Sequence, residues 1–312
     1  MLIIGHRGCS YKGYNQNTIR CYKKIIDQGA KAFEFDVQLT KDKHLVVVHN
    51  LNLSKVSDGT GLIVNKTLSE IKKLHAGKIA NGLDPIPTLK DVLELVSSYE
   101  KDKRPVMHLE LKGDNTGFYS GQIIKKYIES KKLDSNDFLI SSFNWIELEK
   151  IRESCPFLKI ALLDGSIRRK QLLDKIESNP SIFSDIFAYG EEDYMLPFSP
   201  SLEDAIKVIN EKVESEKDKS ILIEEVKKAL NGDYYNDELI NTALKMNAVS
   251  LNLWYQTVSK DFIKKVQAKG LKVLLYTVND KKDIENIVNL NPDGFFTDYY
   301  KETKEYYESL IK

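Results

Sequence analysis

Three carboxylates in this sequence are spaced so that they could share one metal ion. Glu34 and Asp36 lie two residues apart in the alternating segment AFEFDVQL (32–39), and Glu110 lies in VMHLELK (106–112). Successive side chains of a strand point to opposite faces, so the apolar residues of both segments leave all three carboxylates facing one interior. Unpaired buried carboxylates repel one another or protonate. A divalent cation would compensate them, and an all-carboxylate set favours Mg²⁺ or Ca²⁺ over zinc or copper.

An ordinary ion pair is the competing explanation for these carboxylates. Arg7 follows the first apolar run and Lys112 ends VMHLELK, so either cation could neutralise one carboxylate. For a lone Glu-x-Asp pair on a strand, an ion pair and a metal ligand are equally good explanations. Three acids that converge beside two histidines favour the metal.

Those two histidines end predicted strands beside the carboxylates. His6 follows the apolar N-terminal run, and His49 ends the segment HLVVVH. A single histidine in such a position is more often a packing or hydrogen-bonding residue, but a pair next to a metal can act as general acid and base. Arg7 could bind a phosphate with two donors, and Lys112 could bind it as a point charge. The combination indicates cleavage of a phosphodiester.

Alternating strand and helix patterns predict the scaffold that would bring these residues together. Strand-like segments occur eight times, nearly all followed by helical patterns, at 1–4, 32–39, 106–112, 138–143, 158–164, 248–254, 272–278 and 294–298. Eight β/α repeats in a chain of 312 residues favour an α/β fold of the TIM (β/α)8 barrel type over a doubly wound sheet. In such a barrel the carboxyl ends of the strands open into one shared mouth.

We expect a single domain over residues 1–312 with two insertions. A small excursion at about 50–87 follows the second strand and its hairpin arm, and it holds one short helix capped by Thr67 and Glu70. The fifth and sixth strands are separated by far more chain than the roughly 30 residues of an ordinary βα unit. We therefore place a larger insertion at about 165–245.

Composition excludes several classes of protein. Lys plus Arg and Asp plus Glu both number 46, so no global positive charge would gather nucleic acid. No run of 18 apolar residues occurs, and the N-terminal apolar run is too short for a signal peptide, so we expect no stable membrane insertion. The cysteines, Cys9, Cys21 and Cys155, have no metal or CxxC spacing, which predicts reduced thiols in a cytoplasmic protein.

Taken together, the motifs resemble those of the glycerophosphodiester phosphodiesterase family. The resemblance rests on HRG (6–8), NT (17–18), EFDVQLTKD (34–42), VVVHN (46–50), IPTLKDVLEL (86–95), LELK (109–112), YTVND (276–280) and DGFFTDYY (293–300). It implies a TIM barrel with a small excursion after the second strand. It also implies that the metal ligands are Glu34, Asp36 and Glu110. The acid/base histidines would be His6 and His49, and the phosphate contacts would be Arg7 and Lys112.

The function that the resemblance implies is metal-dependent hydrolysis of a small glycerophosphodiester to sn-glycerol 3-phosphate and an alcohol. Trp254 on the predicted strand at 248–254 could contact the glycerol carbons or a choline-like headgroup, and core packing explains it equally well.

Two other functions stay open. One is a lysophospholipase D-like phosphodiesterase, although no basic amphipathic helix supports membrane docking. The other is a catalytically lapsed barrel that binds phosphate esters. Gln16 and Asn50 favour the lapsed barrel, because they stand where the family usually has Glu and Asp and each deletes a negative charge.

Overall fold

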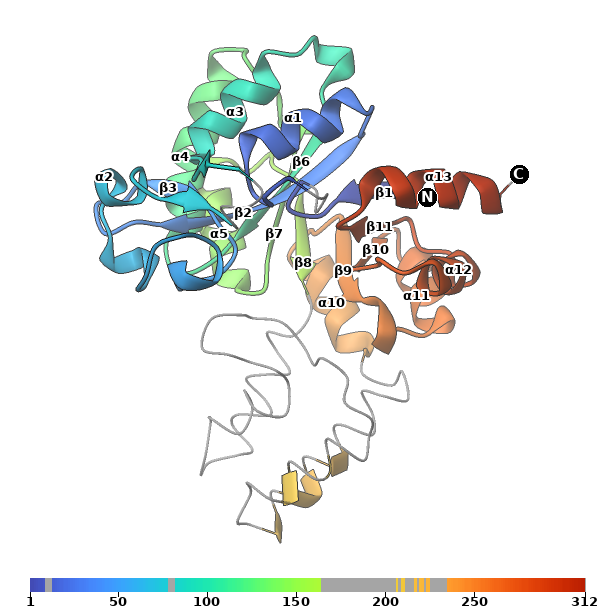
Figure 1. Cartoon of the computed structure of the whole chain (residues 1–312). Helices are drawn as coiled ribbons and strands as arrows, with labels where there is room; N and C mark the ends of the chain where they lie inside the picture. Colours follow the sequence, from blue (N-terminus) through green and yellow to red (C-terminus); the bar gives the residue numbers. More distant parts are fainter. Residues whose placement is uncertain are drawn as a thin grey trace.

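A (β/α)8 barrel forms the body of the computed structural model (Figure 1). The structure describes residues 1–8, 13–77, 82–163 and 235–311, together with short helical stretches between 206 and 224. The barrel closes because β1 pairs in parallel with both β11 and β2. Its strands are β1 (Leu2–Gly5), β2 (Ala32–Leu39), β6 (Val106–Leu111), β7 (Phe138–Ser142), β8 (Ile160–Leu163), β9 (Ser250–Trp254), β10 (Lys272–Tyr276) and β11 (Gly294–Thr297). The eight strands predicted from the sequence are confirmed.

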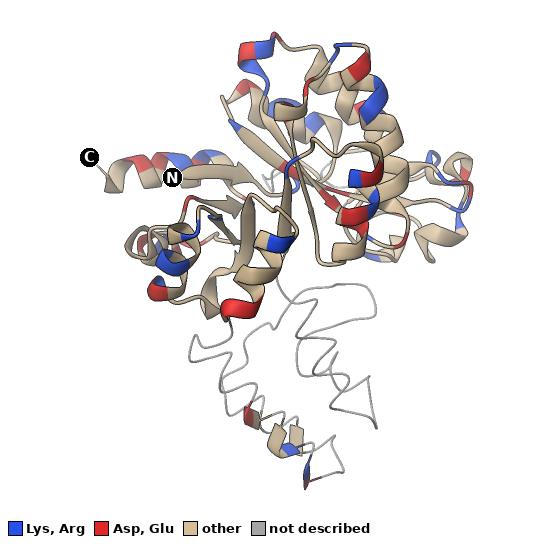
Figure 2. Cartoon of the chain, turned by 180° about the vertical axis from the view of Figure 1, so that it is seen from behind, with Lys and Arg blue, Asp and Glu red and all other residues tan. Residues whose placement is uncertain are grey.

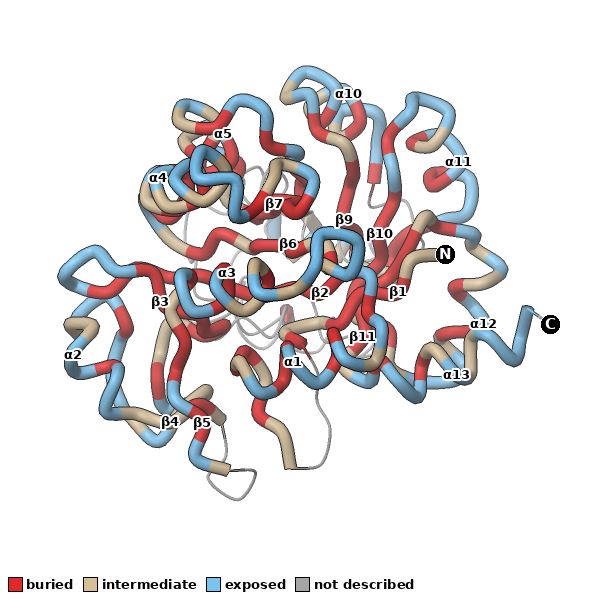
Figure 3. The backbone as a smooth tube through the Cα atoms, turned by 90° about the horizontal axis from the view of Figure 1, so that it is seen from above, coloured by how far each residue is buried: buried red, intermediate tan, exposed pale blue. Residues whose placement is uncertain are grey.

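Helices surround the strands and turn their apolar faces inward, so that buried chain lies at the centre and exposed chain at the rim (Figure 3). Side-chain caps begin several of them; Thr18, for example, accepts a hydrogen bond from the Cys21 backbone N–H. The helices are α1 (Ile19–Asp27), α3 (Leu89–Ser97), α4 (Thr116–Glu129), α5 (Trp145–Ser154), α10 (Asp237–Lys245), α11 (Lys260–Ala268), α12 (Lys281–Leu290) and α13 (Tyr300–Leu310). Three 3-10 turns join elements of the barrel: η4 (Lys101–Lys103), η5 (Ser135–Asp137) and η6 (Tyr255–Thr257).

The alternation of β2 divides the core into two layers. Phe33 and Phe35 pack between the strands and the helices, where the Phe33 ring lies 4.8 Å from the Tyr22 ring of α1. A second apolar cluster fills the inside of the barrel with residues such as Ile4 and Phe296. Because neighbouring side chains of a strand point to opposite faces, the carboxylates of β2 point into the barrel.

The small excursion after β2 has its own apolar core. It follows β3 (Leu45–Val47), the predicted hairpin arm, which pairs antiparallel with β2. It continues through η1 (Leu53–Lys55), η2 (Ile63–Asn65), α2 (Leu68–Ile71), β4 (His75–Ala76) and β5 (Asp84–Pro85). The predicted capping box of Thr67 and Glu70 is present at the start of α2. Its core consists of Val46, Val48, Leu53, Ile63, Ile71, Ala76 and Ile86.

The predicted insertion at about 165–245 lies mostly outside the described residues. Its last part forms α10, whose Ile240 and Ala243 belong to the core between strands and helices. Residues 237–245 are therefore a helix of the barrel itself.

The cysteines differ from the expectation of three reduced thiols. Cys21 is disulfide-bonded, whereas Cys155 is a buried free thiol. The prediction is wrong because sequence spacing does not report which sulfur atoms the fold brings within bonding distance. The cytoplasmic prediction loses the support it drew from reduced cysteines.

The surface agrees with the balanced composition. Basic and acidic residues are interspersed along the helices (Figure 2), as equal totals of 46 lead one to expect. Within the described ranges, no helix combines the length and the apolar character that a membrane span requires.

Candidate functional site

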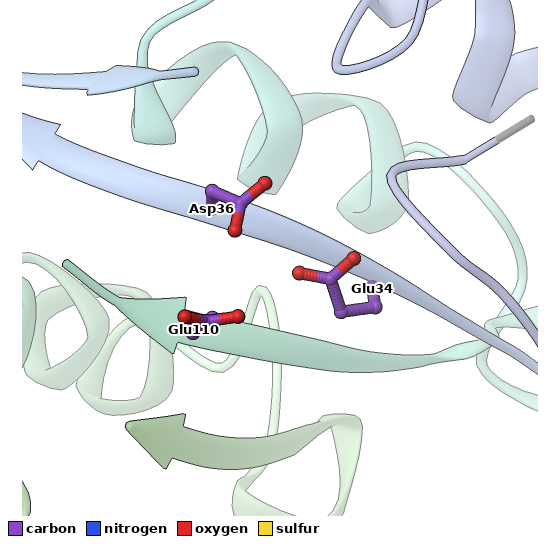
Figure 4. Close-up of side chains that lie close together, drawn as sticks. All are labelled: Glu34, Asp36 and Glu110. Carbon is purple, nitrogen blue, oxygen red and sulfur yellow. The ribbon is translucent and has the colours of Figure 1, made fainter. Parts of the chain in front are cut away.

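The three predicted carboxylates converge inside the barrel (Figure 4). One oxygen each from Glu34, Asp36 and Glu110 lies within 4.8 Å of the others. The cause is the parallel pairing of β2 with β6, which sets Asp36 directly opposite Glu110. The strand phase read from the sequence thus brings these residues together, and their role as metal ligands stays a prediction.

Two cations partly compensate the cluster. Lys112 Nζ lies 2.7 Å from Glu110 Oε1 and 3.5 Å from Asp36 Oδ1. Arg7 Nε lies 3.7 Å from Asp36 Oδ2, and the Arg7 backbone N–H donates to Glu34 Oε2 over 2.8 Å. The ion pairs that the sequence allowed therefore exist. Two cations against three ionised carboxylates still leave one net negative charge.

The close packing of these carboxylates shifts the pKa values of Glu34 and Asp36 in opposite directions. Burial, together with the charge of Asp36, raises the pKa of Glu34 well above its ordinary value. Burial also acts to raise the pKa of Asp36, but Lys112 and the other cations outweigh it and hold that pKa below its ordinary value. Carboxylates that share one site behave in this way when one of them lies nearer to the cations than another does.

Two carboxylate oxygens lack hydrogen-bond partners. Glu34 Oε1 and Asp36 Oδ1 are buried, and no described residue donates to either. Buried polar atoms in proteins are nearly always satisfied. Buried carboxylate oxygens without hydrogen-bond donors, in a cluster of three carboxylates and two cations, fit a hard divalent cation such as Mg²⁺ or Ca²⁺, which would favour the ionised form of all three.

The turn after β1 brings Arg7 and His6 to this cluster. Arg7 adopts the left-handed conformation with φ 50°, which directs its backbone N–H at Glu34. Gly8 follows with φ 85°, and a Cβ there would come within 2.9 Å of the Tyr22 ring. The glycine of the HRG motif is therefore required both by the backbone and by the close approach of α1.

A carboxylate outside the predicted set holds His6. Asp298, directly after β11, lies with Oδ1 2.8 Å from His6 Nδ1. Asp298 also accepts hydrogen bonds from Gln16 Nε2 at 3.1 Å and from Asn279 Nδ2 at 2.7 Å. Burial acts to raise the pKa of Asp298, but His6 and the other donors outweigh it and lower the pKa to about 2. Asp298 is therefore ionised at neutral pH and leaves His6 Nε2 free to face the carboxylates, 3.9 Å from Glu34 Oε2.

Gln16 and Asn50 both contact the histidine network. Gln16 donates to the carboxylate that holds His6, where a glutamate would repel Asp298. Asn50 Oδ1 lies 3.2 Å from His49 Nδ1, so it can accept a hydrogen bond from that ring, as an aspartate would. Neither residue stands in the acidic cluster, so neither removes a charge from it.

A cavity at the barrel mouth gathers most of the predicted site residues. Its described lining comprises His6, Arg7, Glu34, His49, Glu110, Ser141, Phe143, Leu163, Asn252, Tyr276 and Phe296. Asp36 and Lys112 are not in this lining, because both are buried within the ion pairs of the acidic cluster. Trp254 is not in it either, and packs half-buried against the cluster inside the barrel. The substrate-binding roles of Lys112 and Trp254 stay predictions.

The family of the chain follows from its match to a family model. The model of the glycerophosphoryl diester phosphodiesterase family matches residues 6–180 and 218–302. The chain belongs to this family. Its members among known proteins include the glycerophosphodiester phosphodiesterase of Caldanaerobacter subterraneus subsp. tengcongensis, 28% identical over 312 residues that cover 95% of this chain and 93% of that protein. The enzyme of the same name from Bacillus altitudinis is 27% identical over 303 residues, covering 95% and 94%.

Solved structures of similar chains share the fold. A phosphodiesterase from Oleispira antarctica, in complex with the product sn-glycerol-3-phosphate, superposes with a TM-score of 0.68 at 20% identity and covers 99% of this chain and 97% of that chain. The glycerophosphodiester phosphodiesterase of Thermotoga maritima superposes with a TM-score of 0.59 at 21% identity, covering 98% and 97%. The resemblance, the TIM barrel and the enzyme class predicted from the sequence, a glycerophosphodiester phosphodiesterase, are confirmed.

Proposed function

We propose that this phosphodiesterase hydrolyses glycerophosphodiesters to sn-glycerol 3-phosphate and an alcohol with the help of one divalent cation and two histidines. The observation that carries the proposal is the acidic cluster beside His6 and His49, in which the carboxylate oxygens lie within 4.8 Å of one another and two of them accept no hydrogen bond from a described residue. The product complex of the Oleispira antarctica relative supports sn-glycerol 3-phosphate as the product. We also propose that residues 1–312 form one catalytic domain.

Glu34, Asp36 and Glu110 would hold the cation, Mg²⁺ or Ca²⁺, which when bound neutralises the charge that develops on the phosphoryl oxygens. Arg7 contributes to the same task. Arg7 lines the barrel-mouth cavity, and its Nε makes no hydrogen bond to a described residue, so the guanidinium would donate to a non-bridging phosphate oxygen.

The two histidines transfer protons. Asp298 accepts from Nδ1 of His6, so Nε2 is the atom that exchanges a proton with substrate. Asn50 can hold the His49 ring through Nδ1 in the same manner. One imidazole takes a proton from the attacking oxygen and the other gives one to the departing alkoxide.

Release of sn-glycerol 3-phosphate from a panel of glycerophosphodiesters, with and without chelator, tests this function. We expect release that stops in excess chelator and returns with Mg²⁺ or Ca²⁺. Turnover of lysophosphatidylcholine alone would instead support the lysophospholipase D alternative. No turnover with any divalent ion would support the lapsed barrel.

A further inference from the structure

A second cavity adjoins the barrel mouth and has no part in the function described so far. It has a volume of about 460 Å³, within the range of small-molecule sites. One wall is formed by residues 14–17, between β1 and α1, and the other by residues 54–57 and 76–77 of the small excursion. We call this cavity the side cleft.

Arg7 and His49 line both the side cleft and the barrel-mouth cavity. A phosphodiester has two ester arms that leave the phosphorus in different directions. If the phosphate lies against Arg7, as the proposed function requires, one arm enters the barrel mouth and the other enters the side cleft.

The barrel mouth presents groups that match the glycerol arm, although its open volume in this structure is about 20 Å³, so its side chains must separate to admit the arm. Asn252 is buried and lines that cavity, and its Nδ2 donates to no described residue, so it is a free donor for a glycerol hydroxyl. Ser141 adds a hydroxyl on the same cavity, and Phe143 and Phe296 add apolar surface for the carbon chain. The side cleft is left for the departing alcohol.

The charges of the side cleft define the alcohol it accepts. Its described lining contains two cations, Arg7 and Lys55, and no Asp or Glu. Lys55 is exposed at the end of η1 and makes no ion pair with any described residue. Asn15, Gln16 and Ser57 also line the cleft, and their side chains already donate hydrogen bonds to Asp84, to Asp298 and to the Leu53 carbonyl, respectively.

A quaternary ammonium group finds no counterpart there. Such cations are bound by carboxylates or by the open faces of aromatic rings. Tyr14 is the aromatic residue in the described lining, and the guanidinium of Arg20 already lies 4.7 Å from the centre of its ring.

We propose that the side cleft binds the leaving alcohol, and that Lys55 makes the enzyme prefer an anionic or polyhydroxylated alcohol over choline. This specificity rests on the proposed function, because it assigns the second arm of the same substrate. It predicts that kcat/KM decreases from a glycerophosphoglycerol carrying a terminal phosphate, through glycerophosphoglycerol, to glycerophosphocholine.

Charge reversal at Lys55 tests the proposal. We expect Lys55→Glu to lower the ratio of kcat/KM for the phosphate-bearing substrate to that for glycerophosphocholine by about tenfold, the size expected when a partly exposed ionic contact changes sign. Lys55→Gln should give an intermediate ratio. Lys73→Glu is the matched control, since Lys73 is an exposed lysine of the same excursion outside the described lining of the cleft.

The outcomes separate the specificity from the reaction. An active wild type that prefers glycerophosphocholine, or a ratio that Lys55→Glu leaves unchanged or shifts no more than Lys73→Glu does, overturns the specificity and leaves the proposed function standing. Absence of turnover with every glycerophosphodiester overturns both.

Discussion

Replacing Asp298 with asparagine tests whether the carboxylate that holds His6 serves catalysis. Asp298 accepts from His6, Gln16 and Asn279 at 2.8, 3.1 and 2.7 Å. Asparagine keeps the shape but removes the charge. The side-chain NH₂ of asparagine would also point N–H donors at His6, Gln16 or Asn279, which are themselves donors here.

The structure sets the size of the effect. The environment lowers the pKa of Asp298 from 3.8 to about 2, so its interactions favour the ionised form by roughly 2–3 kcal/mol. An acid/base group in a reaction contributes about 100- to 10,000-fold, and a histidine that loses its orientation forfeits part of this. We therefore expect Asp298→Asn to lower kcat by about 100-fold, while KM changes far less.

The assay follows sn-glycerol 3-phosphate release under steady-state conditions, with a thermal melt of each variant. Asp293→Asn is the matched control, because Asp293 precedes the same strand at the opposite end of the barrel and accepts from the Val273 backbone N–H at 2.9 Å. Both variants should lose some stability, and only Asp298→Asn should lose kcat. Equal kcat values for the two variants would refute a positioning role for Asp298.

Three further predictions use the same protein. Because the pKa of Asp298 is lower in the folded state, its contribution to stability is complete above about pH 4 and disappears as the pH falls through about 2. In urea unfolding, the difference in unfolding free energy between wild type and Asp298→Asn should therefore become smaller as the pH falls over that interval. His49 borders the side cleft and His6 does not, so His49 is the histidine placed to protonate an alcohol that leaves through the cleft. We therefore expect His49→Ala to lose much less activity on the p-nitrophenyl diester of glycerol phosphate, whose leaving group needs no proton, than on glycerophosphoglycerol; equal losses would contradict this. Phe33→Ala should destabilise the fold by about 3–5 kcal/mol in urea unfolding, because it empties a site packed against Tyr22 and Phe35, and a loss below about 1 kcal/mol would contradict the packing.

Local alternation was enough to predict the acidic cluster. In β2 the apolar residues at 33, 35 and 37 fix the face of Glu34 and Asp36, and in β6 the residues at 107, 109 and 111 do the same for Glu110. Neighbouring parallel strands then bring like faces together whatever the loops do. The eight strands were predictable for the same reason, since buried strands leave short apolar runs between turn signals.

Contacts between the first and last strands of the barrel, where it closes, were not predictable from local sequence patterns. Asp298 lies 292 residues from His6 and 282 from Gln16, and it reaches them only because β11 pairs with β1. Residue spacing carries no information on such a contact. The same limit applies to the disulfide of Cys21.

Strand phase also could not separate two roles for Lys112. A lysine that pairs with Glu110 and one that contacts phosphate must both point into the barrel, so the sequence pattern is the same for each. The distances decide where it lies: Lys112 Nζ is 2.7 Å from Glu110 Oε1, in the acidic cluster.

Calorimetric titration of Mg²⁺ or Ca²⁺ into the chelator-treated protein measures the cation site most directly. We expect one ion per chain in the wild type, and binding weakened at least about tenfold in each of Glu34→Gln, Asp36→Asn and Glu110→Gln, because each removes one oxygen ligand and one charge. Activity should fall with binding in the same order. Full activity in excess chelator, or undiminished ion binding in all three variants, would contradict a shared metal ion at these carboxylates.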